Sequence, residues 1–344
     1  IKNKLFLIDC GEGTQVQLRK NKIRFSKINH IFISHLHGDH FFGLIGLIST
    51  FTLLNRVTDL HIYGPKGIKE IIKLQLRLSN SWTNYNLFFH ELESEESEVI
   101  YEDEKVLVKT IPLKHRIYTN GFLFQEKIGE RKLNVDAVQN YEIDSCYYQN
   151  IKNGKDITLE DGRIIENDKL TFDPLPAKSY AFCSDTVYNE VIVPIIENVD
   201  VLYHESTFLQ SEETLAQKTL HSTAQDAAKI ALRANAKQLV LGHYSTRYDG
   251  LGQFKEEAMQ ILGKASHFRK NELINAINDI QIKMKEYGIS ADDLGITGRK
   301  RVGKSTRKPV APKYRNNTTG ETWSGRGKPP KWMAGHDKSQ YLIK

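Results

Sequence analysis

Short apolar segments alternate with helical patterns along most of the first 245 residues. Seven apolar runs end in polar or turn residues, as strands in a covered sheet do. They span residues 4–11, 28–34, 59–65, 105–115, 179–185, 199–207 and 236–245. Between them, residues 64–79, 188–198 and 222–235 have helical patterns, and Ser222 is the predicted N-cap of the last one. Helices between short buried strands predict an α/β fold built in layers.

Histidines and aspartates gather where the predicted strands end. Residues 35–40, His-Leu-His-Gly-Asp-His, directly follow the strand at 28–34 and hold four ligand-type side chains. His115, Asp185 and His243 each stand at or after the end of a later strand. Because strand ends converge at one edge of a sheet, side chains that are distant in sequence can share one site.

The chemical types of these side chains indicate a metal site. Imidazole nitrogen and carboxylate oxygen suit Zn²⁺ or Mn²⁺ without thiolate ligands. Seven ligands exceed the need of one four-coordinate ion, and they fit two ions that share a carboxylate. Two ions about 3.5–4 Å apart are a common arrangement for phosphodiester hydrolysis. The candidate ligands are His35, His37, Asp39, His40, His115, Asp185 and His243.

Composition narrows the class of protein. An apolar fraction of 40% over 344 residues is enough for a sizeable core, and the length predicts two domains or one large domain with an appendage. No run approaches the roughly 20 apolar residues of a membrane span. Cys10, Cys146 and Cys183 form neither a metal-binding spacing nor an even disulfide set, which is typical of a reducing cytoplasm.

Charge divides the chain into an acidic body and a basic tail. Residues 264–344 hold 18 Lys and Arg against 7 Asp and Glu, a net charge of +11, whereas residues 1–263 carry a net charge of −5. This asymmetry indicates a polyanionic partner for the tail. We expect a helical segment over 264–298 and a flexible basic linker over 299–309, with nucleic acid as the partner.

Several blocks within residues 1–262 resemble one enzyme family. They read LIDCGEGTQVQLRK, SHLHGDHFFGLIGLIST, YHESTF, LHSTAQDAA and LGHYSTRY. The SHLHGDH block resembles the signature of the metallo-β-lactamase superfamily, and the other blocks resemble ribonuclease Z, the tRNA 3′-processing endonuclease. The resemblance implies a metallo-β-lactamase-type αββα sandwich over residues 1–263, whose N-terminal strands we expect to be missing. It also implies an arm at about 125–178 that grips tRNA.

The resemblance further implies how the candidate ligands divide between two zinc ions, with Mn²⁺ as an alternative metal. Each ion would take three side chains of its own, and one carboxylate would be shared. The first set is His35, His37 and His115, the second set is Asp39, His40 and His243, and the shared carboxylate is Asp185.

Three residues match the catalytic positions of that family. Asp39 would orient the attacking water and accept its proton, and Glu205 with His221 would deliver a proton to the leaving 3′ oxygen. A carboxylate beside an imidazole holds the ring protonated near neutral pH. The alternatives are a cap or loop ion pair for Glu205 and a surface position for His221. The remaining histidines of this region are interpreted as structural or exposed: His30, His61, His90 and His204.

Residues 310–344 resemble a second family, the DNA-binding domain of H-NS-type nucleoid proteins. The resemblance rests on the segment APKYRNNTTGETWSGRGKPPKWM at 311–333. It implies that a short loop at 324–329 enters the minor groove of A·T-rich DNA, where glycines admit the backbone and the negative potential attracts arginine. The candidate DNA-binding residues are Arg315, Ser324, Arg326, Gly327 and Lys328.

Two functions of different classes follow. The first is a zinc-dependent endoribonuclease that removes the 3′ trailer of precursor tRNA, expected as a cytoplasmic homodimer with a DNA-binding tail that allows nucleoid association. The alternative is an H-NS-like nucleoid or transcription regulator that binds A·T-rich DNA, with the nuclease part an inactive or misfused remnant. A third, weaker hypothesis is a metallo-hydrolase acting on a small phosphodiester.

Overall fold

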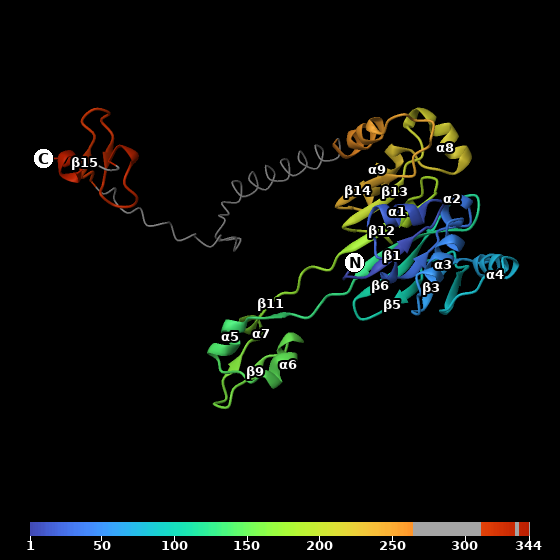
Figure 1. Ribbon diagram of the computed structural model, residues 1–344, viewed down its shortest axis with the longest axis horizontal. Coiled ribbons are helices and arrows are strands. Elements are labelled where there is room, and N and C mark those ends of the chain that lie inside the picture. Colours follow the sequence, from blue (N-terminus) through green and yellow to red (C-terminus); the bar gives the residue numbers. More distant parts are fainter. Residues whose placement is uncertain (264–310, 334–336, 344) are drawn as a thin grey trace, which may run out of the picture. The chain divides into compact units, whose positions relative to one another are not determined.

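The computed structural model describes residues 1–263, 311–333 and 337–343, and the chain divides into two compact units, residues 1–271 and 272–344. The first unit is drawn from blue to orange in Figure 1, and its described part contains two large sheets and two small two-stranded sheets. The helix predicted at 264–298 and the linker predicted at 299–309 lie outside the described residues. Among the described residues, no helix has the length and apolar content that crossing a bilayer requires.

The first sheet of the body has four parallel strands in the order β1-β2-β3-β4. These strands are β1 (Leu5–Ile8), β2 (Ile28–Phe32), β3 (Leu60–Pro65) and β4 (Leu87–Leu92). Helices α1 (Thr14–Lys20), α3 (Leu44–Leu53) and α4 (Ile68–Leu78) pack on one face of this sheet (Figure 1). That packing buries the strand side chains of Ile31 and Ile62 against Leu47 and Ile72 of the helices.

The second sheet has six strands in the order β14-β13-β12-β7-β6-β5. They are β5 (Val99–Glu102), β6 (Val106–Leu113), β7 (Thr119–Glu126), β12 (Ser179–Cys183), β13 (Val201–Glu205) and β14 (Gln238–Gly242). Helix α9 (Ala224–Arg233) covers one face of this sheet, where Ile230 and Ala231 pack against Ala181 and Leu202. The short helices α2 (Gly38–Phe41) and α8 (Glu213–Thr219) also belong to the body, and a further helix begins at residue 252.

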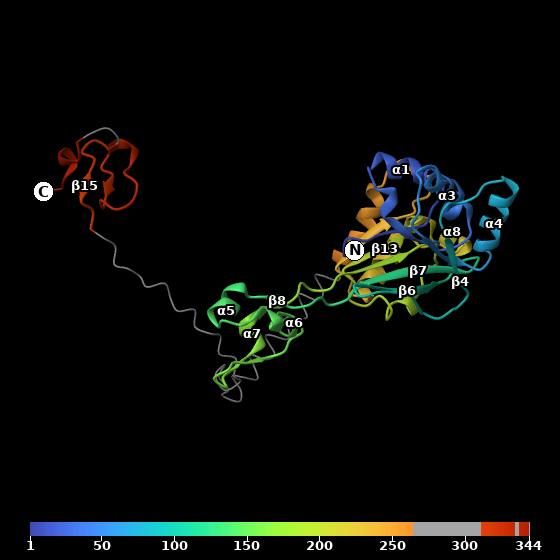
Figure 2. The same cartoon turned by 60° about the horizontal axis from the view of Figure 1, so that its bottom comes forward.

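Figure 2 shows the two large sheets from a second direction. Aromatic side chains from both sheets pack against one another between them. The ring of Phe32 stacks on that of Tyr63 with centroids 4.6 Å apart, and both belong to the first sheet. Phe122 and Phe124 of the second sheet each approach Phe32 with ring centroids 5.3 Å apart. The layers therefore run helix, sheet, sheet, helix, and the predicted αββα sandwich is confirmed.

Two local predictions are wrong. The segment 188–198 contains only a 3₁₀ turn at Glu190–Ile192, because Pro194 lacks a backbone N–H and clashes with the preceding turn of an α-helix. The N-cap of α9 is Thr223, which forms a capping box with Asp226. The hydroxyl of Ser222 instead donates to the backbone oxygen of Thr186 at 2.6 Å.

The segment predicted as an arm contains a small apolar core of its own. Its elements are β8 (Lys132–Leu133), α5 (Val135–Asn140), α6 (Tyr148–Lys152), β9 (Ile157–Thr158), β10 (Ile164–Ile165), α7 (Asn167–Leu170) and β11 (Thr171–Phe172). Strand β8 pairs with β11, so the segment 132–172 closes on itself. Its buried side chains are Val138, Ile143, Ile151, Ile157, Ile165 and Leu170.

The second unit is a small fold built around a two-stranded antiparallel sheet, β15 (Tyr314–Arg315) with β16 (Thr322–Trp323). The rings of Tyr314 and Trp323 lie 5.5 Å apart. After β16 the chain turns through two glycines with positive φ, Gly325 and Gly327, and the indole N–H of Trp323 donates to the backbone oxygen of Arg326 at 3.1 Å. This hydrogen bond holds the turn against the sheet.

Candidate metal centre

The histidine-rich loop after β2 is held by close backbone contacts. The backbone N–H of Cys10 donates to the oxygen of His40 at 2.6 Å, and that of Gly43 donates to the oxygen of Cys10 at 2.8 Å. A Cβ atom added to Gly11 would lie 1.9 Å from the backbone oxygen of Asp39, so only glycine fits there. The backbone of the segment after β1 therefore holds the histidine-rich loop in place.

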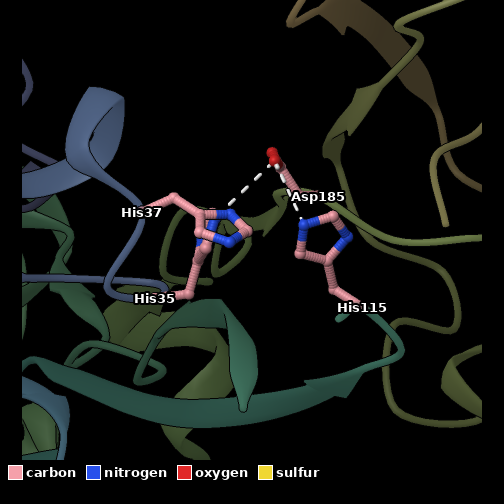
Figure 3. Close-up of side chains that lie close together, drawn as sticks. All are labelled: His35, His37, His115 and Asp185. Atoms are coloured by element: carbon pink, nitrogen blue, oxygen red, sulfur yellow. Dashed lines mark hydrogen bonds and ion pairs between the residues drawn. The ribbon is translucent and has the colours of Figure 1, made fainter. Parts of the chain in front are cut away.

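Three strands of the second sheet bring the remaining candidate ligands to this loop. His115 follows β6, Asp185 follows β12 and His243 follows β14. In Figure 3, His35, His37 and His115 surround the carboxylate of Asp185, which is almost fully buried. The strand-end prediction thus agrees with the geometry of all seven candidate ligands.

The ligand atoms form groups of the size that a metal ion requires. The atoms of His35, His37, His115 and Asp185 lie within 4.8 Å of one another, and so do those of Asp39, His40 and His243. Asp185 stands between the two groups. Its Oδ2 lies 3.6 Å from His35 Nε2 and its Oδ1 lies 3.5 Å from His40 Nε2 and 3.2 Å from His243 Nε2.

Buried nitrogens without hydrogen-bond partners provide a test of whether a cation fits. Five buried side-chain atoms in the described part of the chain have no hydrogen-bond partner, and two of them, His40 Nε2 and His115 Nε2, belong to this cluster. Both nitrogens face Asp185, and the distance from His115 Nε2 to its Oδ2 is 3.9 Å. An unpaired buried polar atom costs free energy, and a coordinated cation would remove that cost. The residues present therefore fit divalent cations.

Burial and neighbouring charges shift the pKa values of these groups. Burial, followed by the nearby His40 and His37 rings, lowers the pKa of His35 to about 2. Burial also opposes charge on His243, but its hydrogen bond to Asp39 and the charge of Asp185 raise the pKa of His243 to about 9. The hydrogen bond with His243 holds the pKa of Asp39 well below its usual range. Asp39 thus remains ionised, as a carboxylate ligand of a metal ion must be.

Asp9 is a functional candidate that the sequence analysis missed. Its Oδ2 accepts a hydrogen bond from His40 Nδ1 at 2.7 Å, and its Oδ1 accepts one from the backbone N–H of Ser34 at 2.7 Å. This contact turns the other ring nitrogen of His40 toward Asp185. Asp9 stands at the end of the strand predicted at 4–11, so the strand-end rule could have found it.

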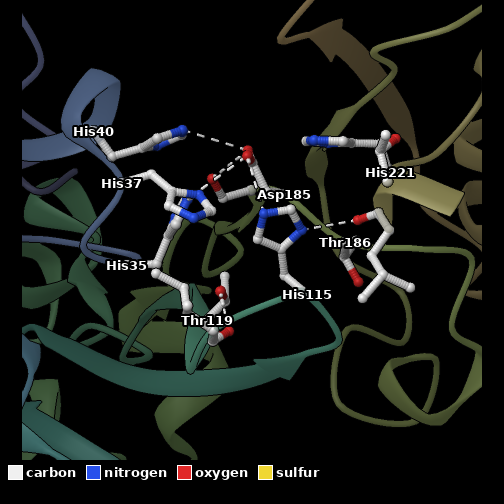
Figure 4. Close-up of polar contacts among 12 residues, drawn as sticks. His35, His37, His40, His115, Thr119, Asp185, Thr186 and His221 are labelled. Carbon is white, nitrogen blue, oxygen red and sulfur yellow. Dashed lines mark hydrogen bonds and ion pairs between the residues drawn. The ribbon is translucent and has the colours of Figure 1, made fainter. Parts of the chain in front are cut away.

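Glu205 and His221 form a buried pair beside the ligand cluster. Oε1 of Glu205 accepts from His221 Nδ1 at 2.9 Å and from the backbone N–H of Thr186 at 2.9 Å. The ring of His221 stacks on that of His243 with centroids 5.5 Å apart, and it appears across Asp185 from His40 in Figure 4. The Nε2 atom of His221 is left for the site, because Nδ1 is bound to Glu205.

Left-handed backbone conformations occur at three non-glycine residues of the site. Asp9, Leu220 and His243 have φ values of 55°, 57° and 59°. Leu220 precedes His221, and its backbone oxygen accepts from His115 Nδ1 at 2.9 Å. Such conformations cost free energy and persist where the surrounding structure fixes them, which is common at functional sites.

The other histidines of the body lie outside this cluster. His30, His61 and His90 stand on neighbouring strands of the first sheet, where His61 Nδ1 and His90 Nε2 are 3.0 Å apart. His204 is buried in β13 and its Nδ1 donates to the backbone oxygen of Glu205 at 2.7 Å. In the second unit, the predicted DNA-binding residues Arg315, Arg326, Gly327 and Lys328 are exposed, and Ser324 is half-buried.

Comparison with known proteins identifies the body. The ribonuclease Z of Bacteroides thetaiotaomicron is 48% identical over 278 residues, which cover 81% of this chain and 88% of that protein. The chain belongs to the ribonuclease Z family. The ribonuclease Z of Cytophaga hutchinsonii is 45% identical over 262 residues, which cover 76% of this chain and 83% of the relative.

Solved structures support the same family and fold. The short form of human tRNase Z is 29% identical, with a TM-score of 0.53 over 72% of this chain and 84% of that one. The metallo-β-lactamase fold protein YhfI of Bacillus subtilis is 17% identical, with a TM-score of 0.50. The match covers 76% of this chain and 81% of the YhfI chain. The sandwich of this ribonuclease Z family member is therefore a metallo-β-lactamase fold.

Two family descriptions match separate parts of the chain. Residues 1–152 match the anti-Pycsar protein Apyc1 family. Residues 309–343 match the H-NS histone C-terminal domain, in agreement with the predicted resemblance of the tail. The chain thus joins a ribonuclease Z body to an H-NS-type C-terminal domain.

Proposed function

We propose that the body is an endoribonuclease that removes the 3′ trailer of precursor tRNA by phosphodiester hydrolysis. One observation carries this proposal, namely the convergence of seven metal-ligand side chains with the Glu205–His221 pair at one edge of the sandwich. Membership of the ribonuclease Z family supports the choice of tRNA as the substrate.

Two divalent cations are expected to be bound here, and zinc is the metal we propose because imidazole and carboxylate suit it. His35, His37 and His115 would hold one ion and Asp39, His40 and His243 the other, with Asp185 shared. When bound, the pair of ions would activate a water and stabilise charge on the phosphate oxygens. Mn²⁺ has compatible ligand preferences.

The chain's own residues would move the protons. Asp39 is ionised and exposed at the mouth of the site, so it can accept a proton from the attacking water. His221 presents Nε2 to the site and can protonate the leaving 3′ oxygen. The buried carboxylate of Glu205 fixes the ring through Nδ1 and offsets its positive charge while the proton is held.

A precursor tRNA labelled at its 5′ end tests the proposal. The zinc-loaded protein should release a tRNA that ends in a 3′ hydroxyl, and His37→Ala should abolish this cleavage while leaving the fold intact. His90→Ala is the matched control, because His90 is an exposed histidine outside the cluster. Equal activity of the two variants would refute the site. Faster turnover of bis-p-nitrophenyl phosphate than of precursor tRNA would favour a small phosphodiester as substrate.

We further propose that the C-terminal unit binds A·T-rich DNA. The support is the match to the H-NS histone C-terminal domain together with an exposed turn in which Arg326 lies between two glycines with positive φ and Lys328 follows the second one. A narrow minor groove attracts such a turn. Deletion of residues 264–344 should abolish salt-sensitive binding to an A·T-rich duplex. Unchanged affinity after the deletion would contradict this proposal.

The assembly and the location of the protein are proposed on the same grounds. A homodimer is expected, and light scattering after gel filtration measures it directly. The cytoplasm is the expected compartment, with nucleoid association through the C-terminal unit. Fluorescence microscopy of the tagged full chain and of the chain without residues 264–344 tests this location, since only the full chain should follow the nucleoid.

A further inference from the structure

We propose that Thr207 is a positioning residue that joins the two halves of the centre, the ligand His243 and the proton-delivering pair Glu205–His221. This inference rests on the proposed function and adds a residue to its site. The hydroxyl of Thr207 lies within hydrogen-bond distance of both halves, 2.8 Å from His243 Nδ1 and 2.7 Å from Glu205 Oε2.

The direction of these hydrogen bonds follows from the chemistry of the groups. An ionised carboxylate only accepts, so the hydroxyl proton of Thr207 goes to Glu205. The oxygen of Thr207 then has only lone pairs left and must accept from His243 Nδ1. His243 therefore carries a proton on Nδ1, and its Nε2 faces Asp185 Oδ1 at 3.2 Å. This is the ring orientation that ligation through Nε2 requires.

The same hydroxyl completes the hydrogen bonds of the buried acid. Glu205 is fully buried, and each of its oxygens accepts two hydrogen bonds. Burial alone would raise the pKa of Glu205, but the hydrogen bonds from His221 and Thr207 bring it below its usual value. Without the Thr207 hydroxyl, one donor to an ionised buried carboxylate would be lost, and such a loss is costly.

The surroundings of Thr207 hold its hydroxyl in one position. Thr207 follows β13 and is 7% exposed, and the backbone N–H of Ser245 donates to its backbone oxygen at 3.1 Å. Its own backbone N–H donates to Glu205 Oε2 at 3.0 Å. A β-branched side chain is stiff about χ1, so these contacts leave the hydroxyl fixed between the two groups.

Three variants test the proposal in the full chain. Thr207→Val keeps the shape and removes the hydroxyl, whereas Thr207→Ser keeps the hydroxyl. Thr50→Val is the matched control, because Thr50 is also 7% exposed and donates its hydroxyl to Gln15 Oε1, on helix α1. Zinc affinity is measured by competition with a chelator, and kcat and KM are measured with precursor tRNA at saturating zinc.

The expected result separates Thr207→Val from the other two variants. It should bind zinc about 10–100-fold more weakly than the parent protein and should lose kcat by a similar factor, with KM unchanged. Thr207→Ser should recover most of both losses, and Thr50→Val should bind zinc and cleave as the parent does. Zinc affinity and kcat equal to the parent in Thr207→Val would overturn the proposal.

A measurement on the unaltered protein covers the case in which Thr207→Val does not fold. Imidazole ¹⁵N NMR of the zinc-loaded chain reports which ring nitrogen of His243 carries the proton. Protonation at Nδ1 supports the proposal, and protonation at Nε2 overturns it. If the parent protein cleaves no precursor tRNA but the zinc affinities still separate as expected, the proposed function fails and the positioning role stands.

Discussion

The candidate sites of the body and of the C-terminal unit are built in opposite ways. In the body, residues from position 9 to position 243 follow strands of both large sheets and meet at one edge of the sandwich, where most of them are buried. In the described part of the C-terminal unit, the candidate residues lie within 315–328 and most are exposed, while Met333 is the buried apolar side chain. The geometry of a site assembled from distant strands depends on how the strands pack. The geometry of a contiguous turn depends on the local backbone conformation.

This difference determines what a substitution should do in each region. In the body, a buried side chain has several partners, so one change should disturb a network of contacts. In the C-terminal unit, an exposed side chain has few partners, so one change should remove one contact with nucleic acid. The two activities should therefore respond independently to substitutions in the two regions.

The largest effect is expected at the shared carboxylate. Asp185→Asn keeps the shape but removes a charge that faces both ligand groups, so cleavage should fall by about a thousandfold or more and zinc should be lost. Metal analysis and single-turnover cleavage measure this, while affinity for A·T-rich DNA should stay at the parent value. Asp59→Asn is the control, because Asp59 precedes β3 and its carboxylate accepts a hydrogen bond from the exposed side chain of Asn86. Normal cleavage by Asp185→Asn would remove Asp185 from the site.

A smaller loss is expected at the carboxylate that orients His40. Asp9→Asn weakens the hydrogen bond to His40 Nδ1, so zinc affinity and cleavage should fall about 10–100-fold. Asp103→Asn is a suitable comparison, since Asp103 bonds Tyr101 and the turn at Lys105, away from the ligands. If the two variants behave alike, Asp9 has no orienting role.

Substitutions in the C-terminal turn should change DNA binding alone. Arg326→Ala should weaken binding to an A·T-rich duplex by about tenfold and reduce the preference over G·C-rich duplexes. Lys328→Ala should weaken binding to both duplexes equally. It should also reduce the slope of log affinity against log salt concentration by about one. Fluorescence anisotropy at several salt concentrations separates the two patterns. A change in tRNA cleavage with either variant would contradict the independence of the two regions.

The smallest effect concerns the pH dependence of stability. Burial and the neighbouring His61 lower the pKa of His30 to about 4 from 6.5. Below pH 6.5 the unfolded chain binds a proton that His30 does not bind in the folded state, so this group lowers the free energy of unfolding as the pH falls toward 4. Urea unfolding between pH 7 and pH 4 should therefore be less pH-dependent in His30→Phe. The described residues of the C-terminal unit contain no histidine, so their unfolding should not share this dependence.

The sequence predicted where the candidate ligands meet, because each candidate follows an apolar run of the kind that forms a covered strand. His115 and Asp185 are 70 positions apart, yet both were assigned to one edge by that rule. The family resemblance supplied the roles, which spacing alone leaves open. The αββα layers followed from the same alternation of strands and helices.

Other features could not be predicted, because they depend on tertiary contacts. The position of Asp9 at a strand end is visible in the sequence, but its hydrogen bond with His40 depends on how the loop after β2 packs against it. The cap of α9 falls on Thr223 because Ser222 bonds Thr186, which is distant in sequence. The missing helix at 188–198 is a different case, because Pro194 is visible in the sequence and argues against an α-helix there.

The closure of the inserted segment has a consequence for the evolution and engineering of the chain. The backbone N–H of Glu126 donates to the oxygen of Lys178 at 2.8 Å, so the chain leaves and re-enters the second sheet at adjacent points. Everything between these points has its own apolar interior. We therefore expect that the inserted segment can be shortened, exchanged between homologues or replaced by a short linker while β7 and β12 stay paired. The inserted segment and the candidate metal ligands are thus open to separate change.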